Sequence, residues 1–301
     1  MYVRAIALAL VGVFLCGGIT HAQMSSSNFQ IRWDSVSAGG SDTSSSASYG
    51  LRDTMDPSAS PRSSSASYLL DSGYRQGIFD EIITFDLLVQ NSATVKAATA
   101  YGGGIISGDS DGTSVGDYVV LIQDRGVGQV AGIGKVTGIG IGSVMIDRLA
   151  TAGVVPVIDG TNDYFYRLSG SALALGTLAN DTIRTGIVAF QVTAENENGY
   201  VVQVLEDGNL RDGVSAITDV ADGSVSVGSS EYGARSSDSS IATSTFDTQD
   251  SPLTASGQAV ATSDTAAVNE RTFLTLKAAV DGAAAAGAYG QVLTFIASGN
   301  F

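Results

Sequence analysis

Short runs of alternating side chains, separated by glycine and aspartate, recur through the C-terminal half of the chain. Between residues 187 and 193, successive side chains point to opposite faces if the backbone is extended. Asn198-Gly199 is a hairpin dipeptide, and it leads into a second run at 200–205. The alanine run 283–286 is bounded by glycines that leave less than two helical turns, so no helix is predicted there. These patterns predict an all-β protein.

Residues 1–22 have the three parts of a secretory signal. Arg4 supplies a positive end, residues 5–16 are apolar, and Thr20 and Ala22 are the small residues before a cleavage site. The apolar run is shorter than the roughly 20 residues that a membrane-spanning helix needs. We therefore expect cleavage after Ala22, no transmembrane segment in the mature chain, and a secreted, extracellular or cell-surface location.

Cleavage at this point has a chemical consequence. The single cysteine, Cys16, and the single histidine, His21, both leave with the signal peptide. The mature chain then has no disulfide, no Cys/His zinc site and no Ser-His-Asp triad. We expect no catalytic residues, no bound cofactor and no enzymatic activity.

The charge balance restricts the partners. The chain has 15 basic and 30 acidic residues, a formal net charge of −15. Binding to nucleic acid depends on clustered Lys and Arg that replace counterions, so nucleic acid is excluded as a partner. Carboxylates are ligands for hard cations, which leaves calcium open.

Residues 23–79 are predicted to be a Ser-rich β-hairpin repeat region. Serine triplets begin at residues 25, 44 and 63, and an aromatic residue with a short alternating run follows each one. One such repeat is too small to bury its own apolar face, so we expect the repeats to pair as strands. A flexible linker is the alternative interpretation of this segment.

Two further segments are predicted after the repeats. Residues 80–169 are Gly-rich, with strand runs at 82–90 and 118–123, and we expect a small β-barrel or a sheet elaboration. Residues 170–301 alternate most clearly and are expected to form an antiparallel β-sandwich. Within them, residues 236–264 are rich in Ser, Thr and Asp, which predicts a long exposed loop.

Two sets of motifs resemble known proteins. The first is a Ser-x-x-Tyr-x-Leu repeat, at 46–51 and 65–70, that ends in a Gly-Tyr step at 73–74. The second covers 172–301 and includes Asn198-Gly199-Tyr200, Glu206-Asp207-Gly208 and the closing run 289–301. The chain is similar to an uncharacterised group of secreted bacterial cell-surface proteins of candidate-phylum bacteria. The resemblance implies a β-sandwich at the cell surface, and it brings no catalytic residues.

The Gly-rich stretch at 126–131 has the outline of a dinucleotide-binding fingerprint. That mechanism requires a helix whose N-terminus faces the pyrophosphate. Glycines continue at 132, 134, 138, 140 and 142, and each costs a helix interior about 1 kcal/mol relative to alanine. The stretch instead predicts a Gly-rich β-hairpin.

One acidic turn is a candidate calcium site. Asp109, Asp111 and Asp117 lie in a Gly-, Ser- and Asp-rich segment, and alternating aspartates before a glycine place oxygens around a cation. The third ligand and the final glutamate of an EF-hand are missing. A plain exposed turn is the alternative, because Asp and Gly are ordinary turn residues.

Taken together, these patterns predict a secreted or cell-surface structural or adhesive protein. Its expected partners are a cell-envelope polymer, a glycan or other copies of itself. The first alternative is an extracellular glycan- or calcium-binding module. The second is a carboxylate-based hydrolase, for which Glu195 and Glu197 are an alternating pair that is also explained by a solvated strand edge.

Overall fold

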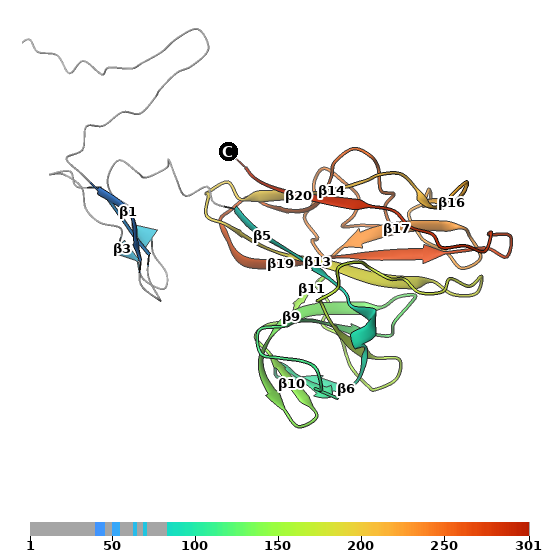
Figure 1. Cartoon of the computed structure of the whole chain (residues 1–301), viewed down its shortest axis with the longest axis horizontal. Helices are drawn as coiled ribbons and strands as arrows, with labels where there is room; N and C mark the ends of the chain where they lie inside the picture. Colours follow the sequence, from blue (N-terminus) through green and yellow to red (C-terminus); the bar gives the residue numbers. More distant parts are fainter. Residues whose placement is uncertain (1–39, 46–49, 55–62, 65–68, 71–82, 301) are drawn as a thin grey trace, which may run out of the picture. The chain divides into compact units, whose positions relative to one another are not determined.

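The computed structural model describes residues 40–45, 50–54, 63–64, 69–70 and 83–300 (Figure 1). The predicted signal peptide and the aromatic run of the first repeat lie outside these ranges. The chain divides into two units, Met1–Phe79 and Asp80–Phe301.

The first unit contains two short antiparallel pairs. β1 (Gly40–Ser45) pairs with β2 (Gly50–Thr54), and β3 (Ser63–Ser64) pairs with β4 (Leu69–Leu70). β2 and β4 follow the tyrosines of the second and third repeats, where the sequence predicts strands. The short runs after these aromatics are therefore paired strands.

The second unit has sixteen strands in three sheets within residues 83–300. The six-stranded sheet has the order β15 (Leu210–Asp212), β16 (Ser215–Asp219), β17 (Glu231–Ser236), β19 (Ala267–Ala279), β13 (Arg184–Ala194) and β5 (Ile83–Val89). The three-stranded sheet has the order β18 (Gln258–Ser263), β14 (Tyr200–Glu206) and β20 (Leu293–Gly299). The curled sheet has the order β10 (Ser143–Ile146), β7 (Ile105–Gly108), β6 (Lys96–Gly102), β12 (Tyr164–Arg167), β8 (Tyr118–Gln123), β9 (Val130–Gly140) and β11 (Ala150–Thr151).

The prediction of an all-β protein is confirmed. Within residues 83–300 the one helical element is a 3-10 turn at Ser92–Thr94, and the alanine run at 283–286 is not helical, as expected. The part of the chain that the structure describes contains no helix with the length and apolar character to cross a bilayer.

The six-stranded sheet is the middle layer because β13 is apolar on both faces. Val188 and Phe190 pack toward the three-stranded sheet, in one core with β14 and β18. Ile187 and Ala189 pack on the opposite face, against β8 and β9 of the curled sheet. Figure 1 shows β13 and β19 between these two layers. β5 lies at one edge of this sheet, so the start of the 80–169 segment pairs with a strand of the 170–301 segment.

The curled sheet bends back on itself because β9 is long enough to serve two neighbours. Its first half pairs with β8, and its second half pairs with β10, the strand at the other end of the order. β8 is buried on both faces: Val119 and Leu121 face the inside of the curl, and Val120 and Ile122 face the middle sheet. This double burial explains why the β8 run is continuously apolar in the sequence.

The Gly-rich stretch is a turn between two strands. Gly126 and Gly128 have φ values of 120° and 74°, which favour glycine, and β9 begins at Val130. The hairpin interpretation is confirmed. The dinucleotide fingerprint lacks its helix, because the chain continues as a strand.

A buried ion pair joins the curled sheet to the middle sheet. Arg271 of β19 donates to both carboxylate oxygens of Asp147, at 2.8 and 2.5 Å, and its Nε donates to Gln191 Oε1 at 2.9 Å. The Arg271 side chain is 3% exposed and that of Asp147 is 32% exposed. Burial by itself raises the pKa of Asp147, but the Arg271 hydrogen bonds and two backbone amides hold that pKa well below its usual range.

Residues 236–264 differ from the sequence-based prediction. Ile241, Phe246 and Leu253 are all buried in the core shared by the middle and three-stranded sheets. β18 also lies within this segment. The prediction of a long exposed loop is wrong here, because widely spaced apolar residues are enough to anchor a polar segment to a core.

Candidate functional site

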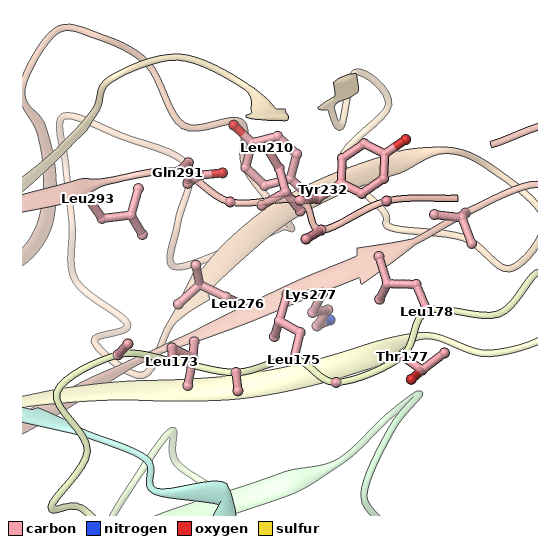
Figure 2. Close-up of a pocket in the computed structure, with 18 of the residues that line it drawn as sticks. Leu173, Leu175, Thr177, Leu178, Leu210, Tyr232, Leu276, Lys277, Gln291 and Leu293 are labelled. Atoms are coloured by element: carbon pink, nitrogen blue, oxygen red, sulfur yellow. The ribbon is translucent and has the colours of Figure 1, made fainter. Parts of the chain in front are cut away.

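An apolar groove with a volume of about 1220 Å³ lies in the second unit (Figure 2). One wall is residues 171–180, which we call the strap. The opposite wall is residues 281–292, which we call the C-terminal loop. The floor includes Leu276 and Val280 from β19 and its continuation, and β5 and β20 border the groove.

The strap presents three leucines to the groove. Figure 2 shows Leu173, Leu175 and Leu178 on the side that faces Leu276 and Tyr232. All three pack against the shared core while remaining partly exposed. The residues between them are Ala, Gly and Thr, which are exposed. This spacing makes the strap an apolar lining without a helix or strand.

Backbone contacts place the strap. The Ser92 hydroxyl donates to the Ala174 carbonyl at 3.1 Å, and Arg184 Nε donates to the Thr177 carbonyl at 2.9 Å. Gly186 of β13 makes room for the first leucine, since a Cβ there would lie 2.9 Å from the Leu173 side chain. A side chain at this position would therefore displace Leu173.

Side chains near both ends of the C-terminal loop form hydrogen bonds with its backbone. Asp281 accepts the Ala283 amide at 3.0 Å, and the Tyr289 hydroxyl donates to the Ala285 carbonyl at 2.9 Å. Val292, at the β20 end, is 61% exposed. These hydrogen bonds order the loop that forms this wall of the groove.

A polar cluster closes one side of the groove. The Tyr232 hydroxyl donates to Glu206, and Gln291 Nε2 lies 3.3 Å from the same carboxylate. Burial raises the pKa of Glu206, against the opposing effect of the Tyr232 hydrogen bond. Burial likewise raises the pKa of Asp219, which also interacts with Tyr232. Two carboxyls with raised pKa values thus stand behind an aromatic wall of the groove.

This cluster predicts a pH-dependent stability. A carboxyl whose folded pKa is raised stabilises the fold below the unfolded pKa, about 4.3 for Glu, and that stabilisation is lost as pH rises through the folded value. We expect Glu206→Gln to unfold at a higher temperature than wild type at pH 7. The two midpoints should converge near pH 4. In a domain of this size, each kcal/mol gained in the free energy of unfolding raises the unfolding midpoint by about 2–4 °C.

Thermal unfolding followed by circular dichroism between pH 4 and 8 measures this difference. Glu195→Gln is the matched control, because Glu195 is exposed near the β13–β14 turn, and its curve should follow that of wild type. A Glu206→Gln midpoint at or below the wild-type value at pH 7 would contradict the prediction.

Two of the three predicted calcium ligands, Asp109 and Asp117, have protein partners for their carboxylates. Asp109 forms an ion pair with Lys96 and accepts the Asp111 amide at 2.9 Å. Asp117 accepts the Ser114 amide at 2.9 Å and lies 3.4 Å from Arg167. In residues 83–300 the structure brings no three acidic, histidine or cysteine side chains together as cation ligands. Calcium binding stays a prediction. Glu195 and Glu197 are both exposed, and they lie in the connection between β13 and β14 rather than at a strand edge.

The groove residues carry little sequence signal. The strap leucines lie among Ala, Ser, Gly and Thr in no helical or strand period, so periodicity does not mark them. Three leucines within six residues of a polar connection are the one available hint. The cluster of Tyr232, Glu206 and Asp219 has no signal at all, because three different strands bring these residues together.

No family model, curated protein or solved structure matches this chain.

Proposed function

We propose that this chain is a secreted structural or adhesive protein of the cell surface that acts by holding a partner in the groove. The observation that supports the proposal is the groove itself: a hollow of about 1220 Å³ with leucines on one wall and a hydrogen-bonded loop on the other. Preformed concave apolar sites with a few polar groups are the usual form of binding sites. The predicted signal peptide at residues 1–22 supports the export part of the proposal.

The lining supports a polymeric partner over a small enclosed molecule. Two of the apolar side chains that line the groove, Val292 and Leu87 of β5, are 61% and 46% exposed, so the lining reaches solvent. Apolar surface of this kind on a secreted protein marks an interaction site. We also infer that the six- and three-stranded sheets are the β-sandwich of the cell-surface group to which the sequence motifs are similar.

Two variants test the proposal. Leu175→Glu places a charge in the groove, and burying an unpaired charge against a partner is unfavourable. Val157→Glu adds the same charge at a position that is 72% exposed and does not line the groove. We expect Leu175→Glu to reduce the cell-associated fraction at least tenfold, and Val157→Glu to leave it unchanged.

Fractionation of the native cells, followed by immunoblotting of the wall, membrane and medium fractions, measures this effect. Circular dichroism of the purified variants checks that both are folded. Equal retention of the two variants would mean that the groove does not hold the partner. If all the wild-type protein were found inside the cell, the surface function itself would be wrong.

A further inference from the structure

The two edges of the three-stranded sheet differ. The outer edge of β18 is covered by side chains from the segment that precedes it. Ser236 Oγ donates to the Val260 carbonyl at 2.6 Å. The Thr262 amide donates to Asp238 Oδ2 at 2.8 Å. Hydrogen bonds of this kind occupy the groups that another strand would need, so this edge is protected against strand addition.

At the other edge, the register of β20 shows which backbone groups are free. At one end the Asn300 amide donates to the Gly199 carbonyl at 3.0 Å, and at the other the Asp207 amide donates to the Val292 carbonyl at 3.1 Å. The pairing between these ends has no bulge. Because hydrogen-bonded pairs alternate in an antiparallel ladder, the even-numbered residues of β20 bond to β14.

The odd-numbered residues of β20 therefore direct their amides and carbonyls away from the sheet. Within residues 83–300, no hydrogen bond reaches these outward groups of Leu293, Phe295 and Ala297. The strand has no proline and no charged residue, and Ile296 is 46% exposed. It lacks the features that usually protect an edge.

This open edge borders the groove. Leu293 and Phe295 line the groove, and so do Leu87 and Val89 of β5 in the sheet opposite. Figure 2 shows Leu293 on the left of the view, on the wall opposite Leu173. A strand added to β20 would place every second side chain on the face that carries Phe295, toward this apolar lining.

Charge indicates which strand fits. Residues 80–301 contain ten basic and 25 acidic residues, a formal net charge of −15, whereas residues 1–79 contain five of each. Near the groove, the cations Lys277 and Arg211 are already paired with Asp250 and Asp207. Asp281, which lines the groove, adds a further carboxylate beside it. This field repels a second copy of the same unit and attracts a basic segment.

We propose that the partner is an extended peptide segment of another protein, with alternating apolar and basic side chains, that adds as a fourth strand to the β20 edge. Its apolar side chains enter the groove and its basic ones lie on the outer face beside Ile296. Main-chain hydrogen bonds supply affinity in strand addition, and the pockets for alternate side chains supply specificity. The assignment rests on the proposed function, since it names the partner of the same groove.

Synthetic peptides test the assignment on the mature chain. The probe is acetyl-Leu-Arg-Val-Thr-Leu-Arg-Val-amide, measured by isothermal titration calorimetry at low salt. One control replaces both arginines with glutamate. A second carries N-methyl groups on the third and fifth residues, whose amides an antiparallel strand directs at β20. A third has the same composition in a non-alternating order. We expect each control to bind at least tenfold more weakly. A control that binds as well as the probe overturns the assignment.

Two substitutions at one exposed position locate the bound peptide. Ile296→Lys should weaken binding of the arginine probe and Ile296→Glu should strengthen it, each by about two- to fivefold, the effect of one cross-strand charge pair. Both changes lie on the exposed face, so thermal midpoints should match wild type. If neither change alters binding, β20 is not the site. If the wild-type protein forms dimers that Ile296→Lys dissociates in analytical ultracentrifugation, the occupant is a second copy and the assignment is wrong.

The two proposals can fail separately. Loss of cell retention in Leu175→Glu without any binding of the probe would preserve the adhesive groove and remove strand addition. Binding of the probe, with retention unaffected by Leu175→Glu, would support strand addition to β20 and remove the adhesive role of the groove.

Discussion

Asp147→Ala is expected to destabilise the second unit by about 3 kcal/mol, the lower end of the range for removing one partner of a buried ion pair. The substitution leaves the Arg271 guanidinium, whose side chain is 3% exposed, without its carboxylate. Gln191 still accepts from Arg271 Nε, and Asp147 itself reaches solvent, so the loss stays near that lower end. Urea denaturation followed by circular dichroism measures it.

A second substitution separates the buried charge from the lost contacts. In the Asp147→Ala background, Arg271→Met replaces the unpaired cation with an apolar side chain, and we expect part of the stability to return. Asp109→Ala is the matched control, because it breaks the more exposed ion pair with Lys96 and should not move the midpoint. If Asp147→Ala behaves like Asp109→Ala, the pair does not hold the two sheets together.

The same pair sets a pH dependence. The folded pKa of Asp147 is depressed, so its stabilisation is complete above about pH 4, the pKa of an unfolded Asp, and is lost as pH falls toward the folded value. The difference in stability between wild type and Asp147→Ala should therefore shrink below pH 4. The stabilisation by Asp147 is therefore lost at low pH, whereas the stabilisation by Glu206 is lost as pH rises.

Phe246→Ala is expected to cost roughly 3–5 kcal/mol, the range for removing a buried phenylalanine side chain. Phe246 is 0% exposed and lies in the core shared by the middle and three-stranded sheets. The backbone around it also contributes, since its carbonyl accepts the Ser236 amide at 2.7 Å. The resulting cavity should lower the unfolding midpoint of the whole second unit.

Thr243→Ala is the control for this prediction, because Thr243 is exposed in the same segment and should be neutral within about 0.5 kcal/mol. Limited proteolysis adds a local readout: in Phe246→Ala, cleavage within residues 236–257 should precede global unfolding. Equal stability of the two variants would mean that the segment is a surface loop, as its composition suggests.

The strands were predictable where local pattern and burial agree. The β8 run is continuously apolar because both of its faces are covered. Successive side chains of the β13 run point to opposite faces, and each face packs in a different core. The turn at Gly126 and Gly128 was predictable because glycine tolerates positive φ. In each case, the residues that determine the structure are neighbours in the sequence.

The candidate site was not predictable in this way. The strap leucines line a groove only because β19 and the C-terminal loop, about 100 residues later, stand opposite them. Similarly, Phe246 looks like one aromatic residue in a polar segment until two sheets surround it. Asp147 resembles a turn residue until Arg271, 124 residues away, reaches it.

The sequence by itself determined the all-β class, the turn positions and the strand character of the main runs, because a period of two and the φ preference of glycine are local properties of the backbone. The tertiary structure alone decided which strands are neighbours, which edge of the three-stranded sheet is open and where the groove lies. Strand pairing depends on contacts between residues far apart in the chain. Alternation specifies that a strand has two faces, but it does not specify what covers them.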